Sequence, residues 1–195
     1  GLPAMADAFA ASFAEVQWIV LAYLLTITAL IVGAGRLGDL LGRRRLLLIG
    51  LSLFTAASVL CGLAPALWVL IAARALQGLG AAAMMALALA MVGEIVPKNR
   101  TGSAMGLLGT MSAVGTALGP SLGGVLVAGL GWPAIFLAMA PASVAAAILA
   151  RRHLPADRAN PGAVRPGFDY LGTLLLALTL SAYALAMTLG RGSFG

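Results

Sequence analysis

Six long apolar stretches, joined by short connections that hold nearly all the charges, decide what this chain can fold into. A helix needs about 20 mostly apolar residues to cross the hydrocarbon core of a bilayer. Stretches of this kind cover residues 18–35, 46–64, 66–93, 103–129, 133–150 and 170–190. They are rich in Leu, Ala, Val, Ile and Met, whereas a membrane barrel shows shorter, alternating segments. The sequence therefore predicts an all-α membrane protein, a polytopic helical bundle.

The composition excludes a soluble domain. Hydrophobic residues make up 62% of the chain and charged residues only 9%, against roughly 25% charged residues in a soluble domain. A soluble enzyme and a disordered tail are both excluded, and the single cysteine, Cys61, excludes an intrachain disulfide. The 25 glycines are about twice the average share of roughly 7%, which favours helices that pack closely.

The basic residues give the expected orientation. Ten of the twelve lie in alternate connections between the stretches, and by the positive-inside rule this side is cytoplasmic. They are Arg36, Arg43, Arg44, Arg45, Lys98, Arg100, Arg151, Arg152, Arg158 and Arg165. The net charge of +6 is then mostly a topology signal, and we expect no nucleic-acid partner.

The two remaining segments are predicted to be connections outside the membrane. Residues 1–17 are too short to span a membrane and hold Asp7 and Glu15, so we expect an exposed external connection. Residues 151–169 contain three prolines and several charges, which predicts a cytoplasmic linker without a helix through it. His153 lies in this linker and is interpreted as a solvated loop residue.

The first basic connection carries the pattern Gly35, Gly38, Asp39, Gly42 and Arg43. Its glycines suit a tight turn between two spans, and its one acid among arginines predicts an ion pair or a contact with a helix end. Taken alone, the pattern is that of a positively charged loop with an incidental aspartate. It resembles, however, the GxLaDrxGrk signature between the second and third spans of the major facilitator superfamily.

Glu94 and Arg100 flank the next basic turn. The resemblance implies that an acid at the place of Glu94 pairs with Arg43 in a cytoplasmic charge network that helps hold the outward-open state. The predicted cytoplasmic gate thus consists of the pattern above together with Glu94 and Arg100. The rival interpretation is that these two are solvated loop charges.

Arg74 is the only charged residue inside the six stretches. A charge at mid-membrane costs about 2.5 to 3.5 kcal/mol on insertion scales, so it normally faces a partner or a cavity. Gln77, three residues later, shares its helix face. The alternative is that Arg74 extends to the outer membrane interface. The segment resembles the family's RxxQGxGaa motif in span four, which implies a role for Arg74 and Gln77 in proton coupling.

The stretch 103–129 contains a regular set of glycines around one proline. Glycines four residues apart form a smooth strip for close helix contact, and the proline favours a bend. The whole string resembles the antiporter signature of span five, GxxxxxxxxGxxxGPxxGG, which is associated with export. Ordinary packing of small residues is the alternative. The matching residues are Gly106, Gly115, Gly119, Pro120, Gly123 and Gly124.

The resemblance implies a fragment of a larger transporter. Residues 168–172 resemble the entry to span seven in the fourteen-span drug:proton antiporter branch. The implied division is an external loop after a missing first span (1–17), five helices of the N-terminal bundle (18–150), the linker (151–169) and an additional span (170–195). The expected location is the bacterial inner membrane, as a multi-pass protein.

The expected function is proton-coupled efflux of drug-like or amphipathic small molecules by the intact parent. The implied partners are the lipid bilayer, protons, a small-molecule substrate and the remainder of the same transporter. We expect no cofactor, because the proton gradient supplies the energy. The isolated chain is expected to be inactive, a prediction that proton-driven efflux from proteoliposomes containing only these residues would refute.

Two alternatives stay open. The first is a facilitator-family transporter of another solute, such as a sugar or siderophore. The second is a non-transporting membrane interaction module. An enzyme is not expected, since the spans contain no HExxH motif, no Ser/His pair and no acidic dyad.

Overall fold

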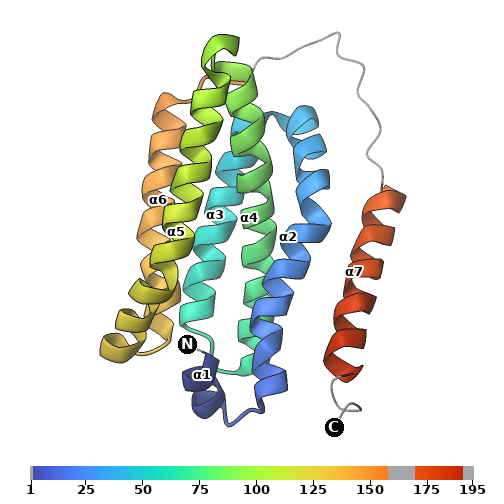
Figure 1. The fold of residues 1–195 in the computed structure, drawn as a ribbon, viewed down its shortest axis with the longest axis vertical. Helices are drawn as coiled ribbons and strands as arrows, with labels where there is room; N and C mark the ends of the chain where they lie inside the picture. The colour runs from blue at the N-terminus through green and yellow to red at the C-terminus, as the bar shows by residue number, and fades with distance from the viewer. Residues whose placement is uncertain (1, 158–169, 191–195) are drawn as a thin grey trace.

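The computed structural model describes residues 2–157 and 170–190, and this part of the chain is helical with no strand. The long helices lie side by side along one direction (Figure 1). Five of them, α2 to α6, are long and apolar enough to cross a membrane. The predicted all-α class is confirmed, and α7 has the predicted bounds. The elements are α1 (Leu2–Phe9), α2 (Phe13–Leu41), α3 (Arg43–Gly62), α4 (Leu67–Ile95), the 3-10 turn η1 (Lys98–Arg100), α5 (Thr101–Leu130), α6 (Pro133–His153) and α7 (Tyr170–Gly190).

Helix α4 is the centre of the packed part, with α2 on one side and α3 on the other, and α6 covers α3. Two glycines of α4 explain the close approach. A Cβ atom added at Gly78 would lie 2.8 Å from the backbone oxygen of Tyr23, and one added at Gly80 would lie 2.7 Å from that of Gly50. Small residues at such positions let helix backbones come together.

The N-terminal segment differs from the prediction of an exposed connection. Residues 2–9 form α1, whose Met5 is buried in a cluster with residues of α2, α3, α4 and α6. Helix α2 begins at Phe13 because Ser12 caps it. The backbone N–H of Glu15 donates to Ser12 Oγ (3.3 Å), and the Glu15 carboxylate accepts from the backbone N–H of Ser12 (2.8 Å). This reciprocal pair is a capping box.

The first basic connection is shorter than predicted. Helix α2 continues to Leu41, and α3 starts at Arg43, so Gly42 alone makes the turn. Its φ of +96° lies in the left-handed region, which favours glycine. At the other basic connection, α6 continues to His153, three residues into the predicted linker. Residues 158–169 of that linker lie outside the described residues.

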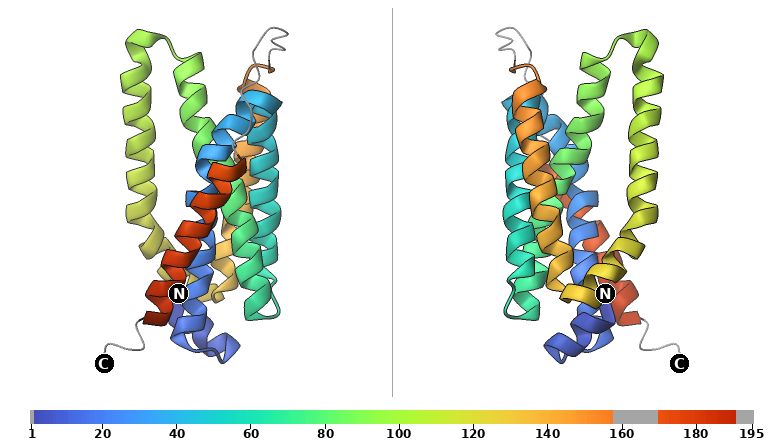
Figure 2. Two further views of the ribbon diagram at one scale, coloured as in Figure 1. Left: turned by 90° about the vertical axis from the view of Figure 1, so that its right-hand side faces the viewer. Right: turned by 90° about the vertical axis from the view of Figure 1, so that its left-hand side faces the viewer.

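Helix α5 stands apart from the other helices along much of its length and curves toward them in its C-terminal part (Figure 2). The helix is continuous from Thr101 to Leu130 and contains Pro120 of the predicted motif. None of the residues of α5 is buried. A Cβ added at Gly106, Gly115, Gly119, Gly123 or Gly124 would meet nothing within 4 Å. The glycine strip therefore packs against nothing in the described part of the chain.

Candidate functional site

Arg74 lies half-buried in α4 and is held by three groups. Its Nε donates to the backbone oxygen of Ile19 in α2 (3.1 Å), and its Nη1 donates to Oε1 of Gln77. The guanidinium also lies over the Tyr23 ring, 4.1 Å from the ring centroid. Such a cation–π contact contributes about 2 kcal/mol when it is shielded from water. Arg74 thus faces partners inside the bundle, as a charge within an apolar helix requires.

Gln77 extends this arrangement into α3. Its side chain is 2% exposed, and its Nε2 donates to Ser58 Oγ (2.8 Å). Ser58 is fully buried and donates in turn to the backbone oxygen of Phe54 (2.7 Å). Buried polar groups require such partners. We call the four side chains of Arg74, Gln77, Tyr23 and Ser58 the arginine cluster. It links α2, α4 and α3.

Aromatic side chains cover the arginine cluster from α6. The Arg74 guanidinium lies 5.7 Å from the Phe136 ring centroid. Phe136 contacts Trp132 edge-on at 6.2 Å, and Trp132 contacts Phe9 of α1 at 5.2 Å. These rings limit the access of water to the guanidinium, which strengthens its electrostatic interactions. The short α1 therefore contributes to the surroundings of the site.

A second group of charges lies at one end of the bundle, which we call the basic end: the α2–α3 turn, the α4–α5 turn and the residues after α6. Arg43 donates to Asp39 Oδ1 through Nη2 (2.9 Å) and Nε (3.0 Å), and to Glu94 Oε2 through Nη1 (3.1 Å). Its Nη1 also donates to the backbone oxygen of Ala90 (3.2 Å). Arg43 thus pairs with Glu94, as the resemblance implied, and it is also the partner of Asp39, for which an ion pair or a helix-end contact was expected.

Other residues predicted for this gate take different positions. Gly38 lies against Leu87 of α4, where a Cβ would collide with the leucine side chain, whereas Gly35 has open space around it. Arg100 is exposed at the end of η1, and within residues 2–157 it takes no part in the Arg43 network. We call Asp39, Arg43 and Glu94 the gate network.

The gate network contributes modestly to stability, because its side chains are 31% (Arg43), 45% (Asp39) and 64% (Glu94) exposed. Exposed ion pairs are worth about 0.2 to 1 kcal/mol.

We therefore expect Glu94→Lys to lower thermal stability slightly by placing two cations together. The charge-swapped pair Arg43→Glu with Glu94→Arg should recover part of the coupling between these positions, although it places a carboxylate at position 43 beside Asp39. Thermal unfolding of the single and double variants checks this, with Arg100→Glu as the matched exposed control. A double variant whose loss of unfolding temperature equals the sum of the losses of the two single variants would contradict the pairing of positions 43 and 94.

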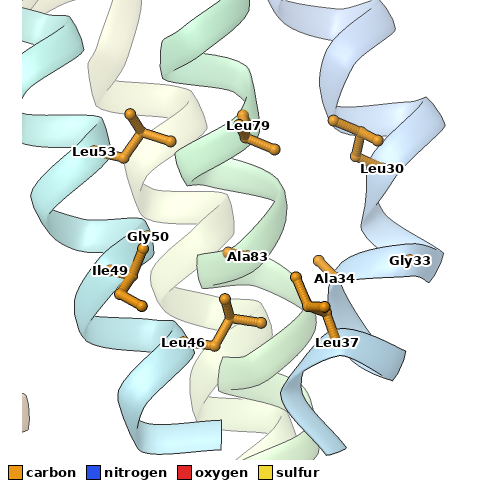
Figure 3. Close-up of a pocket in the computed structure, with 10 residues that line it drawn as sticks. All are labelled: Leu30, Gly33, Ala34, Leu37, Leu46, Ile49, Gly50, Leu53, Leu79 and Ala83. Atoms are coloured by element: carbon orange, nitrogen blue, oxygen red, sulfur yellow. The ribbon is translucent and has the colours of Figure 1, made fainter. Parts of the chain in front are cut away.

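An apolar cavity of about 250 Å³ opens between α2, α3 and α4 (Figure 3). None of its lining side chains is polar, so it offers no group that binds a proton or a polar substrate. Neither the arginine cluster nor the gate network lines it. The lining residues are Leu30, Gly33, Ala34, Leu37, Leu46, Ile49, Gly50, Leu53, Leu79 and Ala83. Among the described residues, no group of three His, Cys, Asp or Glu side chains is placed to hold a metal ion.

Two participants were missed by sequence reasoning alone. They are Tyr23 and Ser58 of the arginine cluster. Tyr23 was assigned no role from the sequence, and Ser58 is one hydroxyl in an apolar helix. Their signal was indirect. A buried Gln77 needs a polar partner on a facing helix, and a buried arginine favours an aromatic face. Which facing residue supplies each partner depends on the helix register, which only the fold defines.

Comparison with known proteins gives consistent results. The family model of the Major Facilitator Superfamily matches residues 1–194. Similar proteins include multidrug resistance protein Stp of Mycobacterium tuberculosis (39% identical, 97% of this chain, 35% of the relative) and riboflavin transporter RibZ of Clostridioides difficile (36%, 95% and 40%). Multidrug transporter protein MdtP of Bacillus subtilis is 35% identical over 89% of this chain and 31% of its own length. The chain spans 26% to 40% of the length of the curated relatives compared with it.

Proposed function

Since the chain belongs to the major facilitator superfamily, as part of an integral multi-pass membrane transporter and not an enzyme, we propose that it serves proton-coupled export of amphipathic small molecules. In this proposal it supplies spans two to seven of a longer transporter in a bacterial inner membrane, with the basic end facing the cytoplasm. No cofactor is involved, because the proton gradient drives transport.

The observation that carries the proposal is the arginine cluster. Arg74 is a fixed cation and the only charge in the apolar stretches predicted from the sequence. Its contacts Gln77 and Tyr23 are neutral, and so is Ser58, which binds Gln77. The cation therefore has no counter-ion among the described residues, and an anionic group elsewhere in the intact transporter is attracted to it strongly. Protonation of that group removes the attraction, which gives a physical route from proton binding to conformational change.

The gate network and α5 take the remaining roles. Facilitator transporters expose a midplane site alternately to each side by rocking two halves. In our proposal the Arg43 pairs stabilise one of the two states at the basic end. The glycine strip of α5, which packs against nothing in the described residues, provides the surface for helices elsewhere in the transporter.

Transport of another solute is the second candidate, and one relative favours it. RibZ is named a riboflavin transporter, whereas Stp and MdtP are named for multidrug resistance or transport. Their similarity to this chain is nearly equal, so the substrate class has to be measured. A flavin and a lipophilic cation differ enough in charge and polarity for one experiment to separate them.

The test uses cells that express the intact transporter and are loaded with either a fluorescent lipophilic cation or riboflavin. We expect efflux of the cation, and its loss when a protonophore collapses the proton gradient. Riboflavin export without cation export would support the second candidate. Cation efflux that persists after the protonophore would contradict proton coupling. Arg100→Ala is the control that should transport normally.

A further inference from the structure

The segment after α6 returns to the turn between α2 and α3. The Asp157 carboxylate accepts the backbone N–H of Arg44 through Oδ1 (2.8 Å) and that of Arg45 through Oδ2 (2.9 Å). These N–H groups belong to the first turn of α3, where no intrahelical acceptor is available. A carboxylate there also interacts favourably with the helix dipole. The residue before α3 is Gly42, which has no side chain to form a local cap.

Two further contacts fix the same segment. Arg44 Nη2 donates to the backbone oxygen of Arg151 (2.6 Å), which ties the end of α6 to the start of α3. A Cβ atom added at Gly42 would lie 2.5 Å from Asp157 Cγ. Glycine is therefore required at position 42 for two reasons. The residue has a positive φ, and the Asp157 carboxylate occupies the space that a side chain would need. Residues distant in sequence thus form one packed junction.

We propose that Asp157 is a positioning residue for the gate network. Arg43 is the first residue of α3, directly before the two N–H groups that Asp157 binds. The cap therefore holds the turn from which Arg43 reaches Glu94 on α4. Loss of the two hydrogen bonds to Asp157 therefore weakens the cap of α3 and loosens the gate network. The inference rests on the gate role proposed above.

The experiment measures the basic end directly, in the intact transporter. Spin labels are placed at Leu41 and Ile95, whose side chains are 49% and 46% exposed at the ends of α2 and α4. Pulsed electron resonance then gives the distribution of distances between them. With Asp157→Ala, the fraction of long distances is expected to rise about two- to tenfold, as for the loss of a helix cap. Asp7→Ala, an exposed acid in α1, is the control and should leave the distribution unchanged.

A second variant distinguishes loss of the cap from general misfolding of the protein. Asp157→Asn keeps one good acceptor oxygen, so the fold is retained and the increase should be smaller than with alanine. Arg43→Ala combined with Asp157→Ala should add little to either single change, since both act on one junction. A wild-type distribution in both Asp157 variants, or fully additive changes, would overturn the proposal. Failure of the proposed transport function would appear separately. The wild type would then show no efflux, while the Asp157 variants would still change the distances between the labels.

Discussion

Arg74→Lys in the intact transporter is expected to lower concentrative export about ten- to a hundredfold, the effect of losing one or two charge-assisted hydrogen bonds. Lysine keeps the charge but not the planar fork of donors. It cannot bind the backbone oxygen of Ile19 and Oε1 of Gln77 while lying over the Tyr23 ring, as Arg74 does. Initial efflux rates in everted membrane vesicles measure the effect.

The control for this variant is Arg100→Lys, because Arg100 is an exposed arginine outside the gate network and the arginine cluster. It should export at the wild-type rate. Membrane levels of both variants are compared by quantitative blotting. Wild-type export by Arg74→Lys would show that a positive charge alone suffices. The geometry of the arginine cluster would then be structural and not part of coupling.

The second large effect is expected at Gly80. In Gly80→Ala the new Cβ would lie 2.7 Å from the backbone oxygen of Gly50 and 2.8 Å from the backbone nitrogen of Phe54. Backbone atoms cannot move aside as a flexible side chain does, so α3 and α4 must separate. Overpacking of this kind costs about 1 to 3 kcal/mol, which exceeds the gain of up to about 1 kcal/mol from replacing glycine in a helix. A lower unfolding temperature in detergent is the expected result.

Gly115→Ala is the matched substitution, since a Cβ at Gly115 meets nothing within 4 Å. We expect this variant to unfold at or slightly above the wild-type temperature, because alanine favours helix. Its export rate should nevertheless fall if the glycine strip of α5 contacts another part of the transporter. Equal destabilisation by the two substitutions would contradict the packing of α3 on α4 described here.

Local patterns allowed much of the fold to be predicted. The spans follow from apolar length alone, and Gln77 was placed beside Arg74 because residues three apart share a helix face. The capping box of Ser12 and Glu15 is a local pattern that was not predicted, and it accounts for the start of α2 before residue 18. Helix α1 had no comparable signal, because eight residues do not form a stable helix without packing.

Contacts between residues distant in the chain have no local signal in the sequence. Asp157 lies 113 residues from Arg44 in a segment whose prolines and charges indicated a solvated linker. Its role as a cap depends on where α6 ends relative to α3, and this depends on the tertiary packing. Arg43 and Glu94 are also distant in sequence, but there the resemblance to a family motif supplied the pairing that spacing could not. The open glycine strip of α5 could be recognised as a motif, while its lack of a partner among the described residues is a property of the fold.

The most direct test of the account is proton movement by the purified intact transporter in proteoliposomes that contain a pH-sensitive dye. With a lipophilic cation added on one side, we expect the lumenal pH to change in the direction of proton–substrate exchange. In Arg74→Lys this pH change should be strongly reduced, and in Arg100→Lys it should be unchanged. Substrate movement without any change in lumenal pH would contradict proton coupling and, with it, the role assigned to the arginine cluster.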